Sequence, residues 1–125
     1  MEAAAVVAVV LLAALTVFQI GLALGAPWGA ASWGGTHPGV LPIRLRVASA
    51  VAGVVVYPLI ALLLLDSGGV IDIGWDVGSL WLWVLTAFFL LGTLANAASR
   101  SKVERVWAPV TLVVAVCCAV IALGT

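Results

Sequence analysis

Charged side chains are scarce in this chain of 125 residues. Asp, Glu, Lys and Arg make up only 8% of it, whereas 66% is hydrophobic and the mean hydropathy is +1.34. A soluble domain keeps roughly a quarter of its residues charged. With only five basic residues and a net charge of zero, the chain also lacks the basic surface that nucleic-acid binding requires. The composition therefore indicates one integral membrane domain covering residues 1–125.

Residues that carry chemistry are also few. The chain has one histidine and two cysteines, and Cys117 and Cys118 are adjacent within an apolar run. Neighbouring cysteines rarely reach disulfide geometry, so we interpret both as small apolar residues. The sequence contains no set of metal ligands, catalytic triad, paired carboxylates or phosphate-binding loop. We therefore predict no metal, cofactor or catalytic residue, and a non-enzymatic role is favoured over an enzyme.

Four long apolar runs account for most of the chain. They cover residues 3–24, 45–65, 80–98 and 106–123. Each approaches or reaches the roughly 20 residues that a helix needs to cross the hydrocarbon core of a bilayer. Pro58 lies within the second run and should kink that helix near residues 54–57. The sequence thus predicts an all-α fold, an antiparallel bundle of four transmembrane helices.

The few charges are segregated between the loops. Arg44 and Arg46 end the first gap, and the third gap holds Arg100, Lys102 and Arg105, whereas Asp66, Asp72 and Asp76 all fall in the second. Loops retained in the cytoplasm carry an excess of Lys and Arg. We therefore predict that both termini lie outside and that the first and third loops are cytoplasmic. Glu2 precedes the first run without any Lys or Arg, which favours a retained span over a cleaved signal peptide.

The segment between the first two runs is long, rich in Gly, Pro and Trp, and almost uncharged. Residues 25–42 contain five glycines and three prolines, which exclude a regular helix. Trp28 and Trp33 favour a position with one apolar and one polar side. Irregular backbone at membrane depth survives only where protein or water satisfies it. We expect this loop to lie in the interface or to fold back under the bundle.

Several polar side chains gather toward the same end of the runs. Because polar groups within a membrane are costly, they are candidates for a site. The candidate pocket comprises Gln19, Trp28, Trp33, His37, Tyr57 and Asn96. In the alternative interpretation these residues only help helices to associate and His37 is a hydrated turn residue. The pairs Gly21–Gly25, Ser49–Gly53 and Ala115–Ala119 have the small-xxx-small spacing typical of such association.

The arginines also allow two interpretations. Arg44, Arg46 and Arg100 are candidate contacts for anionic head groups, with membrane lipids as partners. Alternatively they only determine the topology. In the third loop, Glu104 is expected to pair locally with Arg100 or Lys102.

Two stretches of the sequence resemble a known group. GAPWGAASWGGTHPGVLPIRLRVAS and NAASRSKVERVWAPVTL are similar to the two signature loops of an uncharacterised family of small bacterial integral membrane proteins with four spans. The similarity covers essentially the whole chain, and its most specific part is the PWG…WGG…HPGVLP loop. The resemblance implies four spans and a bacterial inner (cytoplasmic) membrane, and it implies no reaction.

Three functions are compatible with these features. The favoured one is a small membrane protein that binds a lipid or an apolar small molecule, or a partner, at its cytoplasmic-side loop. The second is a small membrane enzyme on a lipophilic substrate, with His37, Tyr57 or Asn96 as acid, base or orienting groups. The third is a transporter or channel assembled as a homo-oligomer. No charged residue lies at the centre of any run, which disfavours ion-coupled transport.

The topology predicts which loops react in intact cells. In a chain with Cys117 and Cys118 replaced by alanine, Lys102→Cys should be protected from a membrane-impermeant maleimide and should react only after lysis. Asp72→Cys, in the acidic loop, is the matched control and should react in intact cells. Labelling of residue 102 before lysis would reverse the predicted orientation.

Overall fold

The computed structural model describes residues 1–125, which form helices joined by loops. The long helices are α1 (Glu2–Ala23), α2 (Ile43–Val51), α3 (Tyr57–Ser67), α4 (Ser79–Ala97) and α5 (Trp107–Leu123), with a π-helical segment η3 (Ala52–Val56) and 3-10 turns η1 (Gly29–Ala31), η2 (Trp33–Gly35) and η4 (Glu104–Val106). α2, η3 and α3 form one continuous rod. Four rods are long and apolar enough to cross a membrane, namely Glu2–Ala23, Ile43–Ser67, Ser79–Ala97 and Glu104–Leu123. The predicted all-α bundle of four spans is confirmed.

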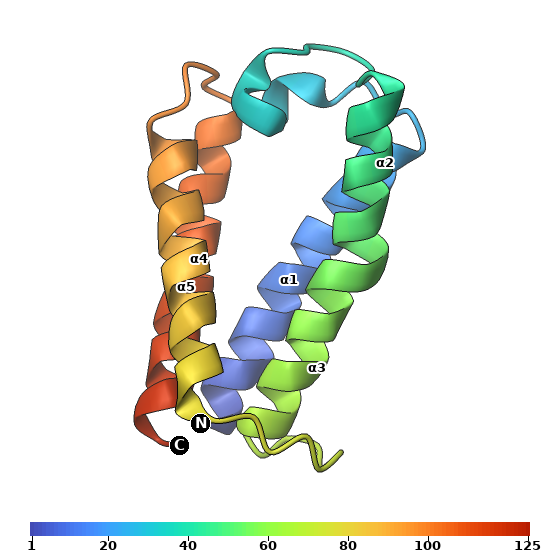
Figure 1. Ribbon diagram of the computed structural model, residues 1–125. Coiled ribbons are helices and arrows are strands. Elements are labelled where there is room, and N and C mark those ends of the chain that lie inside the picture. Colours follow the sequence, from blue (N-terminus) through green and yellow to red (C-terminus); the bar gives the residue numbers. More distant parts are fainter.

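The rods are arranged as two antiparallel hairpins (Figure 1). α1 packs along α2, η3 and α3, whereas α4 packs along α5, and contact between α1 and α5 joins the two hairpins. Loop 1 (residues 24–42) and loop 3 (residues 98–103) lie at one end, which we call the basic end. Loop 2 (residues 68–78) lies with both chain termini at the other, the acidic end (Figure 1).

The hydrophobic core lies toward the acidic end. Its buried members are Ala5, Ala8, Leu12, Leu15, Ile60, Leu64, Leu82, Phe89, Val114, Ala115, Cys117, Cys118, Ile121 and Ala122. They come from the first part of α1 and α4 and from the later parts of α3 and α5. Both cysteines are free and buried, as the interpretation of them as small apolar residues requires. The hairpins are therefore held together at the acidic end and separate toward the basic end.

Pro58 distorts the second rod as the sequence predicts, but the distortion takes the form of a π turn. Proline has no N–H to donate to the carbonyl one turn earlier. The backbone relieves this defect by widening into η3 directly before α3. Within η3, Gly53 lies against α1, because a Cβ there would be 3.1 Å from Ile20 Cγ1 and 3.3 Å from the Thr16 carbonyl oxygen.

One of the expected small-residue helix contacts is wrong. Gly25 lies beyond the end of α1 with a φ of +99°, so it cannot continue a packing face with Gly21. Gly21 instead lies under the ring of Trp28, which would collide with any side chain at that position. The Gly21–Gly25 pair is thus explained by loop 1 folding back onto α1.

The close approach at Gly53 predicts a selective loss of stability. Gly53→Leu should lower the free energy of unfolding by about 1–3 kcal/mol, because the added side chain overpacks the contact with α1. Gly92→Leu is the matched control, since no atom lies within 4 Å of a Cβ at position 92 of α4. Reversible unfolding in mixed micelles measures both variants, and equal stability would contradict the close packing of η3 on α1.

Candidate functional site

Loop 1 forms a compact lid over the basic end. Its two 3-10 turns, η1 and η2, are joined by the extended residue Ser32. The Gly29 N–H donates to the Gly39 carbonyl oxygen at 2.8 Å, which closes the loop on itself. A side chain at position 29 would collide with the carbonyls of His37 and Gly39, so this turn needs glycine. We call residues 29–39 the lid.

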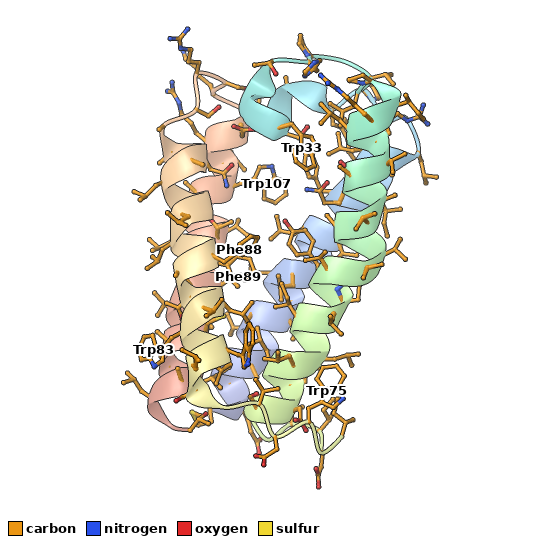
Figure 2. All side chains as sticks on the ribbon, in the orientation of Figure 1. Trp33, Trp75, Trp83, Phe88, Phe89 and Trp107 are labelled. Atoms are coloured by element: carbon orange, nitrogen blue, oxygen red, sulfur yellow. The ribbon has the colours of Figure 1, made fainter.

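A tryptophan attaches the lid to the first hairpin. Trp33 Nε1 donates to Ser49 Oγ of α2 at 2.9 Å, and Ser49 is fully buried. Trp33 has a φ of +48°, which is costly for a residue with a bulky side chain. The strained backbone turns the indole inward from the lid toward the space between the hairpins (Figure 2).

Two further hydrogen bonds attach the lid to the second hairpin. The Gly34 N–H donates to Glu104 Oε2 of η4 at 2.8 Å. The Ser101 hydroxyl of loop 3 donates to the Ala30 carbonyl oxygen. Together with the bond from Trp33, these contacts make the lid a bridge between hairpins that separate at this end.

Beneath the lid lies a cavity of about 510 Å³. Pockets for small molecules typically enclose roughly 300–1,000 Å³. Its walls come from α1 (Leu15, Phe18, Gln19), the lid (Ala31, Ser32, Trp33), the second rod (Ala52, Val56, Tyr57), α4 (Phe88, Asn96) and the fourth rod (Glu104, Trp107, Thr111). All four rods and the lid therefore contribute to one mainly apolar cavity.

Aromatic side chains dominate the walls. Trp33, Trp107 and Phe88 extend from the lid, α5 and α4 toward the space between the hairpins (Figure 2). The Trp107 ring lies against Phe18 of α1, with centroids 4.8 Å apart. Phe88 is 53% exposed although it lies well inside a span. An exposed ring that lines the cavity is a surface available to an apolar ligand.

The cavity also contains a polar atom without a partner. Gln19 Oε1 is buried and accepts no hydrogen bond. Such a group loses its hydration without compensation, at a cost of about 1–3 kcal/mol. Thr111, by contrast, is satisfied by Thr93 Oγ1 at 2.9 Å across the α4–α5 contact. The unpaired amide oxygen is thus the atom that a donor on a bound molecule would satisfy.

One side of the cavity has no helix-to-helix packing. α4 packs along α5 but not substantially against α2, η3 or α3. The lining residues Ala52 and Val56 of η3 therefore face Phe88 and Asn96 of α4 across the cavity rather than in a packed interface. This side of the cavity is the one that an elongated molecule could enter from between the rods.

Four of the six candidate pocket residues line this cavity, namely Gln19, Trp33, Tyr57 and Asn96. Trp28 lines a neighbouring cavity of about 440 Å³, which shares Phe18, Ala31 and Trp107 with the first. His37 lines neither cavity, and its Nδ1 pairs with the hydroxyl of the adjacent Thr36 at 3.0 Å on the surface. The structure thus separates the histidine from the other candidates.

The candidate arginines lie outside both cavities. Arg44 and Arg100 are exposed at the basic end. Arg46 Nε donates to the Ala23 carbonyl at the end of α1, at 3.1 Å. This bond satisfies a carbonyl that has no partner within its helix and places a positive charge at the helix C-terminus, where it is favourable. Elsewhere, no three His, Cys, Asp or Glu side chains gather in a way that could hold a metal ion.

Glu104 is the site residue that sequence reasoning placed wrongly. The expected local pairing with Arg100 or Lys102 is absent, because Glu104 is only 5% exposed and bonds to Gly34 of the lid. A signal was present in the spacing. Glu104, Trp107 and Thr111 follow the i, i+3, i+7 pattern of one helix face, and all three line the cavity. Because Glu104 was interpreted as one half of a local ion pair in the third loop, this shared helix face was not recognised.

No family model, curated protein or solved structure matches this chain.

The attachment of the lid can be tested at Trp33. Trp33→Phe keeps an aromatic ring but leaves the buried Ser49 hydroxyl without its partner, so we expect a loss of about 1–3 kcal/mol in stability. Amide hydrogen exchange in residues 29–39 should also become faster, because one of three anchors is lost. Trp81→Phe, on the exposed face of α4, is the control. Unchanged exchange in the lid of the Trp33 variant would show that this bond does not hold it.

Proposed function

We propose that this chain is a non-enzymatic, multi-pass membrane protein that binds a lipid or an apolar small molecule beneath its lid. The cavity of about 510 Å³ carries this proposal. Its mainly apolar and aromatic walls, with a few convergent polar groups, are the composition typical of small-molecule sites. The unpaired Gln19 Oε1 gives such a ligand a defined polar contact.

The proposed setting is a bacterial inner membrane, with the basic end on the cytoplasmic side. The distribution of Lys and Arg and the resemblance of loop 1 to small bacterial four-span proteins support this placement. The cavity would then lie in the inner-leaflet half of the bilayer. Arg44 and Arg100, which are exposed at that end, would contact anionic head groups of the surrounding lipids.

The open side of the cavity suggests how a ligand enters. Because η3 and α4 are not closely packed, an acyl or alkyl chain would enter between them from the bilayer core. No loop of the chain has to move for that route. The lid, which has three hydrogen bonds to the two hairpins, would stay closed over the cavity, and the ligand would enter from the side.

Two features favour binding over the alternative functions. His37, one of the three candidate groups of the enzyme hypothesis, lines neither cavity and pairs with Thr36 on the surface. The hydrophobic core, where Leu82 and Val114 are fully buried, closes a path to the acidic end through a single chain.

Filling the cavity should abolish binding. Ala52 lines the cavity from η3, so Ala52→Phe should occupy it. The probe is an undecyl alcohol with a terminal bromine, which quenches tryptophan fluorescence on contact, and the protein is held in nanodiscs. Saturable quenching of wild type should weaken by at least about tenfold in the variant, equivalent to a loss of 1.4 kcal/mol in binding.

Val54→Phe provides the matched control in the same segment. Val54 is 65% exposed on the outer face of η3 and lines no cavity, so this variant should bind as wild type does. Thermal unfolding of both variants shows that they are folded. Equal saturable quenching of the Ala52 variant and wild type would refute a ligand site beneath the lid.

A further inference from the structure

The cavity contains a single charged residue, Glu104. Its side chain is 5% exposed and stands at the start of the fourth rod. Oε2 accepts one hydrogen bond, at 2.8 Å, from the neutral N–H of Gly34. Buried carboxylates are ordinarily paired with a positive charge, because removal from water costs several kcal/mol per ion. A neutral donor alone leaves that charge without a counter-ion.

No basic side chain of the chain supplies the counter-ion. Arg44, Arg100, Lys102 and Arg105 are exposed at the basic end, and Arg46 is partly exposed. Arg46 is bonded to the Ala23 carbonyl and Arg105 to the Ser99 carbonyl. None of the five basic residues lines either cavity beneath the lid. The negative charge of Glu104 therefore faces the cavity rather than a partner in the protein.

The surrounding groups also suit a positive charge. Rings from Trp33, Trp107, Phe18 and Tyr57 line the same cavity, and the faces of such rings attract ammonium groups. Gln19 Oε1 adds a buried acceptor without a donor. The Ser32 hydroxyl is occupied by the Gly29 carbonyl, so it offers no donor to an anion. A phosphate or carboxylate would meet repulsion from Glu104 here.

We infer that the ligand of this cavity is a lipophilic cation, that is, an alkyl or aryl amine or ammonium compound whose charge pairs with Glu104. This inference rests on the proposed function and names the ligand class of the same site. The alkyl part lies along Phe88 and η3 toward the bilayer core. The ammonium group lies beneath the lid, between the carboxylate of Glu104 and the indoles of Trp33 and Trp107.

The charge of Glu104 can be removed without removing its hydrogen bond. In Glu104→Gln the amide oxygen can still accept from Gly34, so the lid keeps its anchor. Glu2→Gln, at the acidic end of α1, makes the same change in net charge far from the cavity and is the matched control. Ala52→Phe, with the cavity filled, gives the background from probe dissolved in the bilayer.

Three brominated probes with the same undecyl chain separate charge from apolar contact. They end in a trimethylammonium group, an alcohol or a carboxylate, and tryptophan quenching is measured in nanodiscs of uncharged lipid. Wild type and Glu2→Gln should bind the ammonium probe at least about tenfold more tightly than the alcohol, and the carboxylate most weakly. In Glu104→Gln the ammonium and alcohol probes should bind within about twofold of each other.

Each other outcome overturns a defined part of the proposal. Equal binding of ammonium and alcohol by wild type, or a preference for the carboxylate, refutes a cationic ligand while leaving the apolar site intact. A preference for ammonium that persists in Glu104→Gln refutes the assignment to this residue. If none of the probes binds wild type above the Ala52→Phe background, the proposed function fails as well.

Discussion

The structure depends on the packing of α1 against α5 near the acidic end. Ala8 of α1 is fully buried in the core that both hairpins share, whereas Ala5 lies against Gly68 at the start of loop 2. α4 has no comparable contact with the second rod, so at the basic end the hairpins meet only through the lid and the contact of Phe18 with Trp107. The lid bridges the separation that results. The cavity beneath the lid forms because the hairpins pack together at the acidic end and are bridged by the lid at the basic end.

The polar groups at the basic end fall into two sets with different roles. Ser49 accepts from the Trp33 indole and Ser101 donates to the Ala30 carbonyl oxygen, so these groups are satisfied and hold the lid in place. Gln19 Oε1 is buried without a partner, Glu104 accepts only from the neutral Gly34 N–H, and both residues line the cavity. Because an unpaired buried polar group opposes folding, its retention at one place indicates a role other than stability. The first set therefore holds the lid in place, and the second set provides the groups that would bind a ligand.

The sequence predicts the spans well because hydrophobic composition alone decides them. Gln19, Tyr57 and Asn96, three of the candidate residues, line one cavity, since polar residues within apolar runs tend to face inward. The sequence does not place His37, whose direction follows from the turn that closes the lid. Nor does it place Glu104, because its partner Gly34 lies 70 residues away in the chain. The spacing of Glu104, Trp107 and Thr111 marks one helix face, but it does not reveal the contact with Gly34.

Nuclear Overhauser contacts between the protein and an ammonium amphiphile in nanodiscs would test the central idea most directly. A ligand beneath the lid should give contacts from its methyl groups to the indole of Trp107 and from its chain to the ring of Phe88, which lines the cavity. Leu82, which is fully buried in the core, should give none. Contacts confined to residues on the outer surface of the bundle, such as Val54, with none to Trp107, would contradict a binding site between the hairpins.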